Sequence, residues 1–172
     1  MRRAVPFAAA LMLIANAAVA QETTGPQPWA MPGEETVDPY TVSDANAGTG
    51  PITDPKVFAA FNGREGVARI VATTLDLAYA DARIGPIFKP FERARVERTL
   101  TEHFCYVLGG GCAYTGRDMN ASHKDMGVKA ADMGRLVELL QIAMDKEGVP
   151  FAMQNRFLAK LAPMKRDVIQ KK

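Results

Sequence analysis

A run of three glycines at residues 109–111 interrupts an otherwise helical pattern, and this break limits most strongly how the chain can fold. On both sides of it apolar residues recur at the i, i+3, i+4 spacing of amphipathic helices, without convincing strand alternation. Glycines directly after a helix are typical of helix ends. The stretch 109–123 reads GGGCAYTGRDMNASH and ends at His123. We therefore predict an all-α domain in which this stretch joins two helical halves and presents His123.

Four main helices are expected between Val57 and Lys172. The first follows the break at Asn62-Gly63, the second runs from near Glu92 to about Leu108, the third is capped by Asp132, and the last follows Gly148 and Pro150. Pro163 should kink or end the last helix early. Their inner faces are expected to carry Val67, Ile70, Val71, Thr74, Leu75 and Ala78, then Val96, Leu100, His103 or Phe104, and Val107, then Met133, Leu136, Val137, Leu140 and Met144, and finally Phe157, Leu158, Leu161 and Val168. Short connections favour two antiparallel helix pairs around one modest core.

The first 56 residues have the pattern of a signal peptide followed by a disordered leader rather than that of a folded domain. Arg2 and Arg3, a short apolar run and a small-residue end at residues 18–20 are typical of a signal peptide over residues 1–20, too short to span a bilayer. We expect cleavage after residue 20, no membrane anchor afterwards, and a periplasmic location, with secretion as the second choice. Residues 21–56 are rich in proline and lack periodicity, so a disordered leader is expected, although a docking role for Trp29 and Tyr40 is conceivable. The folded domain is expected over residues 57–172.

Charge does not point to a macromolecular partner. The net charge of the chain is +2, which indicates neither nucleic acid nor a membrane surface. From Val57 onward 18 Lys or Arg stand against 13 Asp or Glu, a mildly basic balance that would suit a cofactor bearing carboxylates and is not specific to one.

Cys105 and Cys112 are the only cysteines in the chain. In an oxidising compartment such a pair favours a disulfide, which would fix the turn that leads to His123. A reactive thiol pair and a zinc site with His103 and His123 are alternatives, although the spacings match no standard zinc motif. The chain contains no C-x-x-C-H motif, so covalent attachment of haem through cysteine is not expected.

Two histidines are candidate iron ligands. Helix faces on either side of His123 predict a pocket of Val, Leu, Phe and Met with one imidazole pointing into it, which is what haem iron requires. Its other ring nitrogen should donate to a backbone carbonyl or to Ser122. His103 lies on or beside the inner face of its helix, where it is either a distal ligand candidate or a packed side chain.

From about Phe61 to Ile169 the chain resembles the truncated haemoglobins, most closely group 1. The resemblance rests on NGREGV at 62–67, on Ile84 and Phe88, on LGGGCAYTGRDMNASH at 108–123 and on GVPFAMQNRFLAKLAPMKRDVI at 148–169. The cysteine pair around the glycines resembles a subset of exported members.

The resemblance implies a truncated globin fold, a two-over-two helical sandwich that binds haem b non-covalently. His123 would be the proximal ligand and Phe88 would stack on the haem, with Tyr114, Met119, Met126 and Val128 on the proximal side and Phe104 in the pocket. From their place on the distal helix we add Arg95 or Arg98 as donors to a haem propionate.

The distal positions depart from the family pattern. The family usually carries tyrosine where this chain has Leu75, and often glutamine where it has Val96 and Leu100. Losing a hydrogen bond to bound dioxygen would raise its dissociation rate on the order of tenfold to a hundredfold unless Thr74, Thr99 or His103 substitutes. The expected function is reversible binding of a diatomic gas (O2, CO or NO) with an unknown reductant. Alternatives are a haem enzyme such as a nitric oxide dioxygenase, and a cofactor-free helical interaction module.

Overall fold

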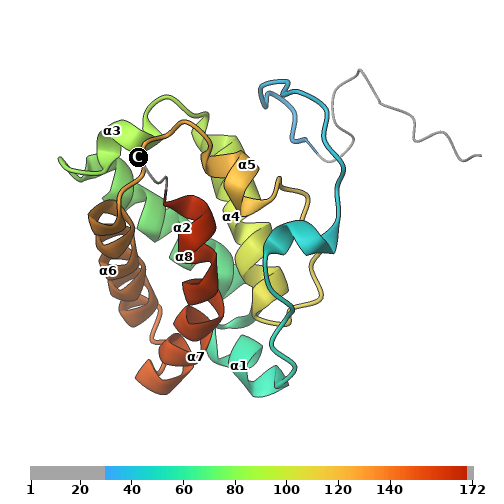
Figure 1. The fold of residues 1–172 in the computed structure, drawn as a ribbon. Coiled ribbons are helices and arrows are strands. Elements are labelled where there is room, and N and C mark those ends of the chain that lie inside the picture. Colours follow the sequence, from blue (N-terminus) through green and yellow to red (C-terminus); the bar gives the residue numbers. More distant parts are fainter. Residues whose placement is uncertain (1–29, 170–172) are drawn as a thin grey trace, which may run out of the picture.

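The computed structural model describes residues 30–169, and every regular element in this range is a helix, as predicted (Figure 1). The elements are η1 (Asp44–Ala47), α1 (Pro55–Ala60), α2 (Gly63–Ala80), α3 (Gly85–Phe88), α4 (Arg93–Val107), α5 (Met119–His123), α6 (Ala130–Lys146), α7 (Phe151–Leu161), η2 (Ala162–Met164) and α8 (Lys165–Val168). Within the described range no helix has both the length and the apolar character needed to cross a membrane.

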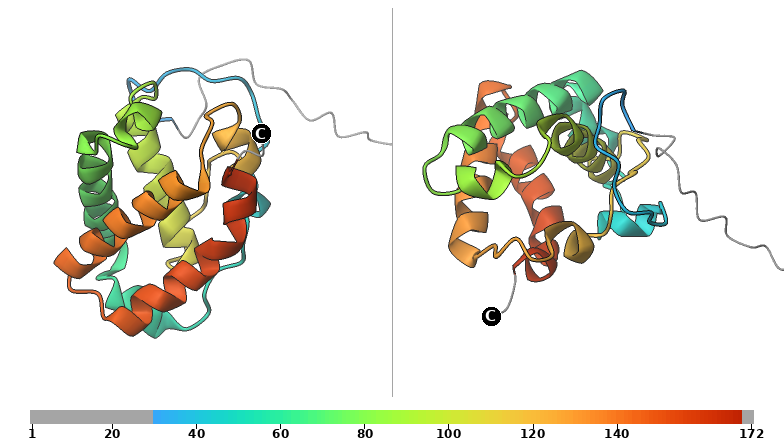
Figure 2. Two further views of the ribbon diagram at one scale, coloured as in Figure 1. Left: turned by 60° about the vertical axis from the view of Figure 1, so that its left-hand side comes forward. Right: turned by 90° about the horizontal axis from the view of Figure 1, so that it is seen from above.

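Helix α2 packs against both α4 and α6 (Figures 1 and 2). It begins at the predicted break, where Asn62 and Gly63 have φ of 58° and 65°. These left-handed conformations turn the chain sharply out of α1. The predicted inner face is confirmed, because all of its residues are buried: Val67, Ile70, Val71, Thr74, Leu75 and Ala78.

The second half of the domain packs on the first through α6 and α7. Phe104 of α4 and Phe61 both meet the ring of Phe157 in α7 edge-on, with centroids 4.9 and 5.3 Å apart. Edge-to-face contacts of this kind add to the burial of the rings themselves. Helix α5 lies against α8, so His123 is held at the junction of the two halves.

The predicted helix ends agree with the structure except at α6. Helix α4 ends at Val107, and the chain leaves the α-helical path at η2, which contains Pro163, before α8 resumes. Asp132 was expected to be the cap of α6, and this is wrong. The helix begins one turn earlier, and the Asp132 carboxylate accepts a hydrogen bond from the backbone N–H of Lys129 at 3.0 Å. A carboxylate in the first turn still satisfies a terminal N–H group.

Residues 30–56 correct the expectation of a disordered leader. Glu34 forms an ion pair with Arg98 of α4, and the hydroxyl of Tyr40 donates to the carbonyl oxygen of Thr115 at 2.6 Å. Ala47 in η1 is fully buried. Its proline-rich composition disfavours a core of its own, whereas its polar groups bind to the neighbouring domain. Residues 1–29, with the expected signal peptide and Trp29, lie outside the described residues.

Candidate functional site

A cavity of about 610 Å³ lies between the two halves of the domain, within the usual range for a small-molecule site. Its wall draws on every helix from α2 to α8 and is mostly apolar. The sequence-predicted residues that the structure brings together around it are His123, Phe88, Val96, Leu100, Phe104, Tyr114, Met119, Met126, Val128, Arg95 and His103.

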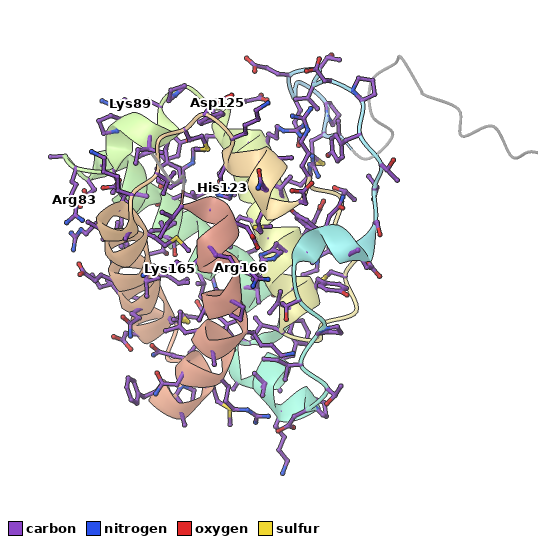
Figure 3. All side chains as sticks on the ribbon, in the orientation of Figure 1. Arg83, Lys89, His123, Asp125, Lys165 and Arg166 are labelled. Carbon is purple, nitrogen blue, oxygen red and sulfur yellow. A yellow bond between two sulfur atoms is a disulfide. The ribbon has the colours of Figure 1, made fainter. Side chains whose placement is uncertain are left out.

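His123 is the last residue of α5 and lies on the cavity wall (Figure 3). The short helix is started by Asp118, whose carboxylate accepts a hydrogen bond from the backbone N–H of Ala121 at 2.9 Å. Nδ1 of His123 lies 2.8 Å from the carbonyl oxygen of Met119, the kind of backbone partner that was predicted. Burial lowers the pKa of His123 below its ordinary value, although the Met119 carbonyl partly opposes this. The imidazole is therefore neutral at pH 7, with its ring lone pair on Nε2 when Nδ1–H donates.

Tyr114 holds the loop that leads into α5. Its ring is 4% exposed, and its hydroxyl donates to the carbonyl oxygen of Arg117 at 2.8 Å. Burial is the main reason why its pKa is raised, so the phenol stays protonated and keeps its donor. The same side chain occupies the space beside Gly116, where an added Cβ would collide with the tyrosine hydroxyl and ring. The Tyr-Thr-Gly sequence thus fixes the path of the chain towards His123.

His103 borders the cavity but is 5% exposed and closely packed. Its Nε2 lies 2.9 Å from the carbonyl oxygen of Ala47, and its ring meets the Tyr114 ring edge-on at 5.1 Å. Burial lowers its pKa below the ordinary value. A ring nitrogen engaged with a backbone carbonyl favours the interpretation of His103 as a packed side chain over that of a distal ligand.

Cys105 and Cys112 form the predicted disulfide, with Cα atoms 5.7 Å apart. The bridge ties the last turn of α4 to the loop before α5. Gly109 and Gly111 have φ of 81° and 70° and reverse the chain between the two cysteines. Among residues 30–169 no group of three or more His, Cys, Asp or Glu side chains is placed to hold a metal ion, so the zinc alternative finds no support there.

Residues 56–170 match the family model described as bacterial-like globin, which is most of the chain. The protein belongs to the bacterial-like globin family. Globins bind haem, and the cavity beside His123 has the size of a small-molecule site and largely apolar walls.

Individual relatives are distant. The group 1 truncated haemoglobin GlbN of Mycolicibacterium paratuberculosis is 24% identical over 112 residues, which cover 65% of this chain and 82% of that protein. Among solved structures, the truncated haemoglobin of Tetrahymena pyriformis has a TM-score of 0.64 at 22% identity. A Synechococcus 2/2 haemoglobin with covalently attached haem has a TM-score of 0.62 at 19% identity. Each structure covers 67% of this chain and is itself covered to 98%, so the two-over-two fold is shared over the domain.

Two predicted site residues do not reach the cavity wall of this globin. Leu75 is fully buried in the core cluster, and its neighbour Thr74 faces the cavity instead. Adjacent helix positions differ by about 100° around the axis, and the rotation of α2 turns Thr74 to the cavity and Leu75 into the core. Arg98 was a candidate for a propionate, but its guanidinium is bound by Glu34 and Glu102.

Two threonine hydroxyls lie on the parts of the cavity wall formed by α2 and α4, and both donate to their own helices. Thr74 Oγ1 donates to the carbonyl oxygen of Ile70 at 2.7 Å, and Thr99 Oγ1 lies 2.9 Å from that of Arg95. Threonine in a helix commonly bonds backward in this way. Neither proton is then directed into the cavity, and the rest of the α4 wall near them is formed by Val96 and Leu100.

The wall residues that sequence reasoning missed include Glu35, Val37, Arg117 and Lys165. The sequence gives only a weak indication that Arg117 and Lys165 reach the cavity: Arg117 lies inside the central motif, and Lys165 follows the predicted break at Pro163. For Glu35 and Val37 there is no such indication, since they belong to the segment that was expected to be disordered.

Proposed function

We propose that this globin binds haem b non-covalently, with His123 as proximal ligand, and reversibly binds a diatomic gas (O2, CO or NO). The observation that carries the proposal is a neutral imidazole on the wall of a largely apolar cavity, with its Nδ1 held by the Met119 carbonyl. A hydrogen bond to the second ring nitrogen orients a metal-ligating histidine and increases its basicity. Haem would supply the iron to which the gas binds.

The other cavity residues include apolar side chains for the haem macrocycle and basic side chains for its propionates. Phe88, Phe104 and Leu140 give apolar surface for the macrocycle. The basic side chains of Arg95, Arg117 and Lys165 border the cavity, as do the acidic Glu35, Glu92 and Asp132, and the three basic groups offer donors for two propionates. Both cysteines are in the disulfide, which supports a non-covalent cofactor over one attached through cysteine.

The distal wall favours weak retention of dioxygen. Bound dioxygen carries partial negative charge and is held by hydrogen-bond donors, whereas CO and NO bind with less charge on the ligand. Because Val96 and Leu100 are apolar and the hydroxyls of Thr74 and Thr99 bond to backbone carbonyls, oxygen should leave quickly. A reductant that keeps the iron ferrous would come from elsewhere in the cell.

We also propose export to the periplasm, with secretion as the second choice, on the basis of residues 1–20 and the disulfide. In fractionated cells the mature protein should begin at Gln21 and appear outside the cytoplasm. A cytoplasmic protein that retains Met1 would overturn this part.

The function is tested by titrating haemin into the purified haem-free protein. We expect a Soret band that grows linearly to one haem per chain, with quenching of tyrosine and tryptophan fluorescence. Serum albumin, which also takes up haemin, would serve as the competitor that separates specific from weak binding. No Soret band, or transfer of all haemin to albumin, would contradict the proposal.

A further inference from the structure

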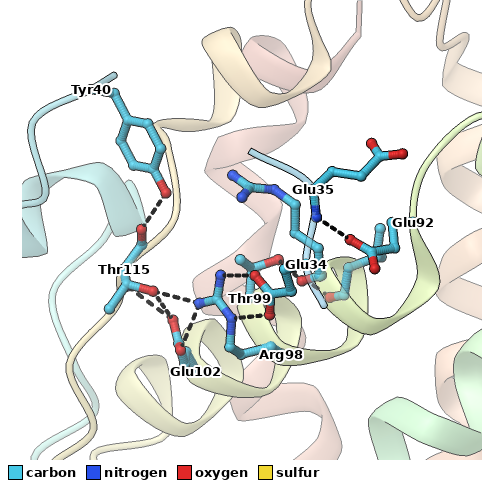
Figure 4. A network of polar contacts seen from close by, with 10 residues as sticks. Glu34, Glu35, Tyr40, Glu92, Arg98, Thr99, Glu102 and Thr115 are labelled. Atoms are coloured by element: carbon cyan, nitrogen blue, oxygen red, sulfur yellow. Dashed lines mark hydrogen bonds and ion pairs between the residues drawn. The ribbon is translucent and has the colours of Figure 1, made fainter. Parts of the chain in front are cut away.

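The segment before the globin domain is ordered against it although the family does not include it. The family match begins at residue 56, and the related structures leave about a third of this chain uncovered. Residues 34–47, here called the strap, are described by the structure and bind the domain at three places. Figure 2 shows the course of the chain in this region, and Figure 4 shows the contacts of Glu34, Glu35 and Tyr40.

The first place is Arg98 on α4. Its Nε and Nη2 atoms donate to the two carboxylate oxygens of Glu34 at 2.6 and 2.8 Å. The Glu34 side chain is fully buried and that of Arg98 is 12% exposed. The Arg98 guanidinium holds the pKa of Glu34 below its ordinary value, so the carboxylate is charged. A two-pronged pair with little solvent access is of the stronger class of ion pair.

The second place is the loop that precedes α5. Besides the Tyr40 contact with Thr115, the side-chain amide of Asn46 donates to the Gly116 carbonyl at 3.1 Å. Arg117 of the domain also contacts the strap. Its Nη2 donates to the Asp38 carbonyl at 2.8 Å, and its guanidinium lies 5.1 Å from the centre of the Tyr40 ring. The strap thereby fixes Arg117, which also borders the cavity.

The third place is the carbonyl oxygen of Ala47, which binds Nε2 of His103. Between the first and second places the strap reaches the cavity itself, where Glu35 and Val37 form part of the wall. The backbone N–H of Glu35 is held by the Glu92 carboxylate at 2.8 Å, just before α4. The strap therefore spans from α4, on one side of the cavity, to the approach to α5, on the other.

We infer that the strap is part of the cofactor site: it closes the cavity between α4 and the loop before α5, positions Arg117, and slows the loss of haem. This inference rests on the proposed haem-binding function. A segment outside the family domain thereby helps to retain the cofactor. Val37 would contact the haem from the cavity wall, whereas Glu34 would hold the strap in place through Arg98.

Two matched pairs of variants in the full-length mature protein test the inference. Val37→Asp places a carboxylate on the cavity wall, whereas Val42→Asp makes the same change at a half-buried strap position that does not border the cavity. Glu34→Gln removes the charge that binds Arg98, whereas Asp44→Asn removes a charge at an exposed strap position. Haem loss is followed by transfer to an excess of a haem-free acceptor globin. Cleavage of the strap by a protease is followed in the haem-free proteins as a second readout.

We expect Glu34→Gln to lose haem on the order of tenfold faster than wild type, the factor for one lost charged hydrogen bond. Val37→Asp should also lose haem faster, because it places a charge on a largely apolar cavity wall. Glu34→Gln should also make the strap more sensitive to protease before any haem is added, and Val42→Asp and Asp44→Asn should behave as wild type. Val37→Ala against Val42→Ala replaces the first pair if an aspartate variant does not fold.

Equal haem loss in wild type and all four variants would overturn the role of the strap while leaving the haem function intact. Equal acceleration in all four would also overturn it, because the effect would then follow any change in the segment. A wild-type protein that takes up no haem would overturn the proposed function and the inference with it. The haem titration of the wild type separates that outcome from the first two.

Discussion

Nδ1 of His123 lies 2.8 Å from the carbonyl oxygen of Met119, one turn earlier in α5. This contact fixes the ring orientation from within a five-residue helix that is started by Asp118. Because the acceptor is backbone, it is set by the helix itself rather than by a further side chain. A ligand can thus be oriented by a very short stretch of sequence.

Replacing His123 by glycine should abolish tight haem binding. Losing only an outer partner of a metal ligand typically costs roughly 10–100-fold in affinity, so losing the ligand should cost more. Added imidazole should restore the Soret band, because the glycine leaves room for it beside the same cavity. A His123→Gly protein that binds haem normally without imidazole would exclude His123 as the proximal ligand.

The haem-free protein should lose stability as the pH falls below about 6.5. Burial lowers the pKa of His103 and His123 from that ordinary value, so below it the unfolded chain binds more protons than the folded one. Their contribution is complete above pH 6.5 and declines towards their lowered folded pKa values, by at most about 1.4 kcal/mol per pH unit for each histidine.

Urea unfolding between pH 5.0 and 7.5 measures this slope. The pKa of Glu34 is lowered from an ordinary value of 4.5, so that carboxylate titrates below the window. His103→Gln and His123→Gln should each reduce the slope. A free energy of unfolding that is constant across the window would contradict the prediction.

A donor introduced on the distal wall should slow the release of dioxygen. Leu100→Gln would place an amide beside the ligand, and a hydrogen bond to a partly charged acceptor should reduce the dissociation rate about tenfold to a hundredfold. Stopped-flow measurement on the ferrous protein gives this rate, and CO release should change far less. Leu100→Met is the apolar control of similar size. If Leu100→Gln releases dioxygen as fast as Leu100→Met, the assignment of Leu100 to the distal wall is wrong.

Removing the disulfide should destabilise the domain. In the chain-entropy model a loop of this length contributes about 2–3 kcal/mol, and the double variant Cys105→Ala with Cys112→Ala should show that difference in denaturant unfolding. Wild type treated with a reductant should approach the stability of the double variant. A thiol assay on the denatured, unreduced protein should find no free thiol, and two thiols would show that the bridge does not form.

Periodicity predicted the domain well because its helices are amphipathic and end at glycine or proline. The buried face of α2 from Val67 to Ala78 follows the helical repeat without exception. The break at Pro163 follows from the missing N–H of proline, and the turn after α4 from the left-handed Gly109. The stretch that brings His123 to the cavity could also be predicted, because glycines mark its beginning after α4.

The strap and the direction of single side chains could not be predicted in this way. Glu34 has no periodic neighbour, and its partner Arg98 lies 64 residues further along the chain. That pairing is a long-range contact between two polar residues, for which local sequence holds no signal. The choice between Thr74 and Leu75 at the cavity depended on the rotation of α2, which a sequence pattern fixes to a face about 100° wide.

The most direct test of the central claim is the absorption spectrum of the haem-loaded protein in its ferric and ferrous forms, and after addition of CO. We predict a five-coordinate ferrous form with a rapid shift of the Soret band on CO addition, because His123 alone would bind the iron and the opposite side would be open to a gas. A protein that stays colourless after haemin is offered and the unbound haemin is removed would contradict the claim and favour a helical interaction module. A six-coordinate ferrous form would show instead that a second side chain, with His103 as the first candidate, occupies the gas site.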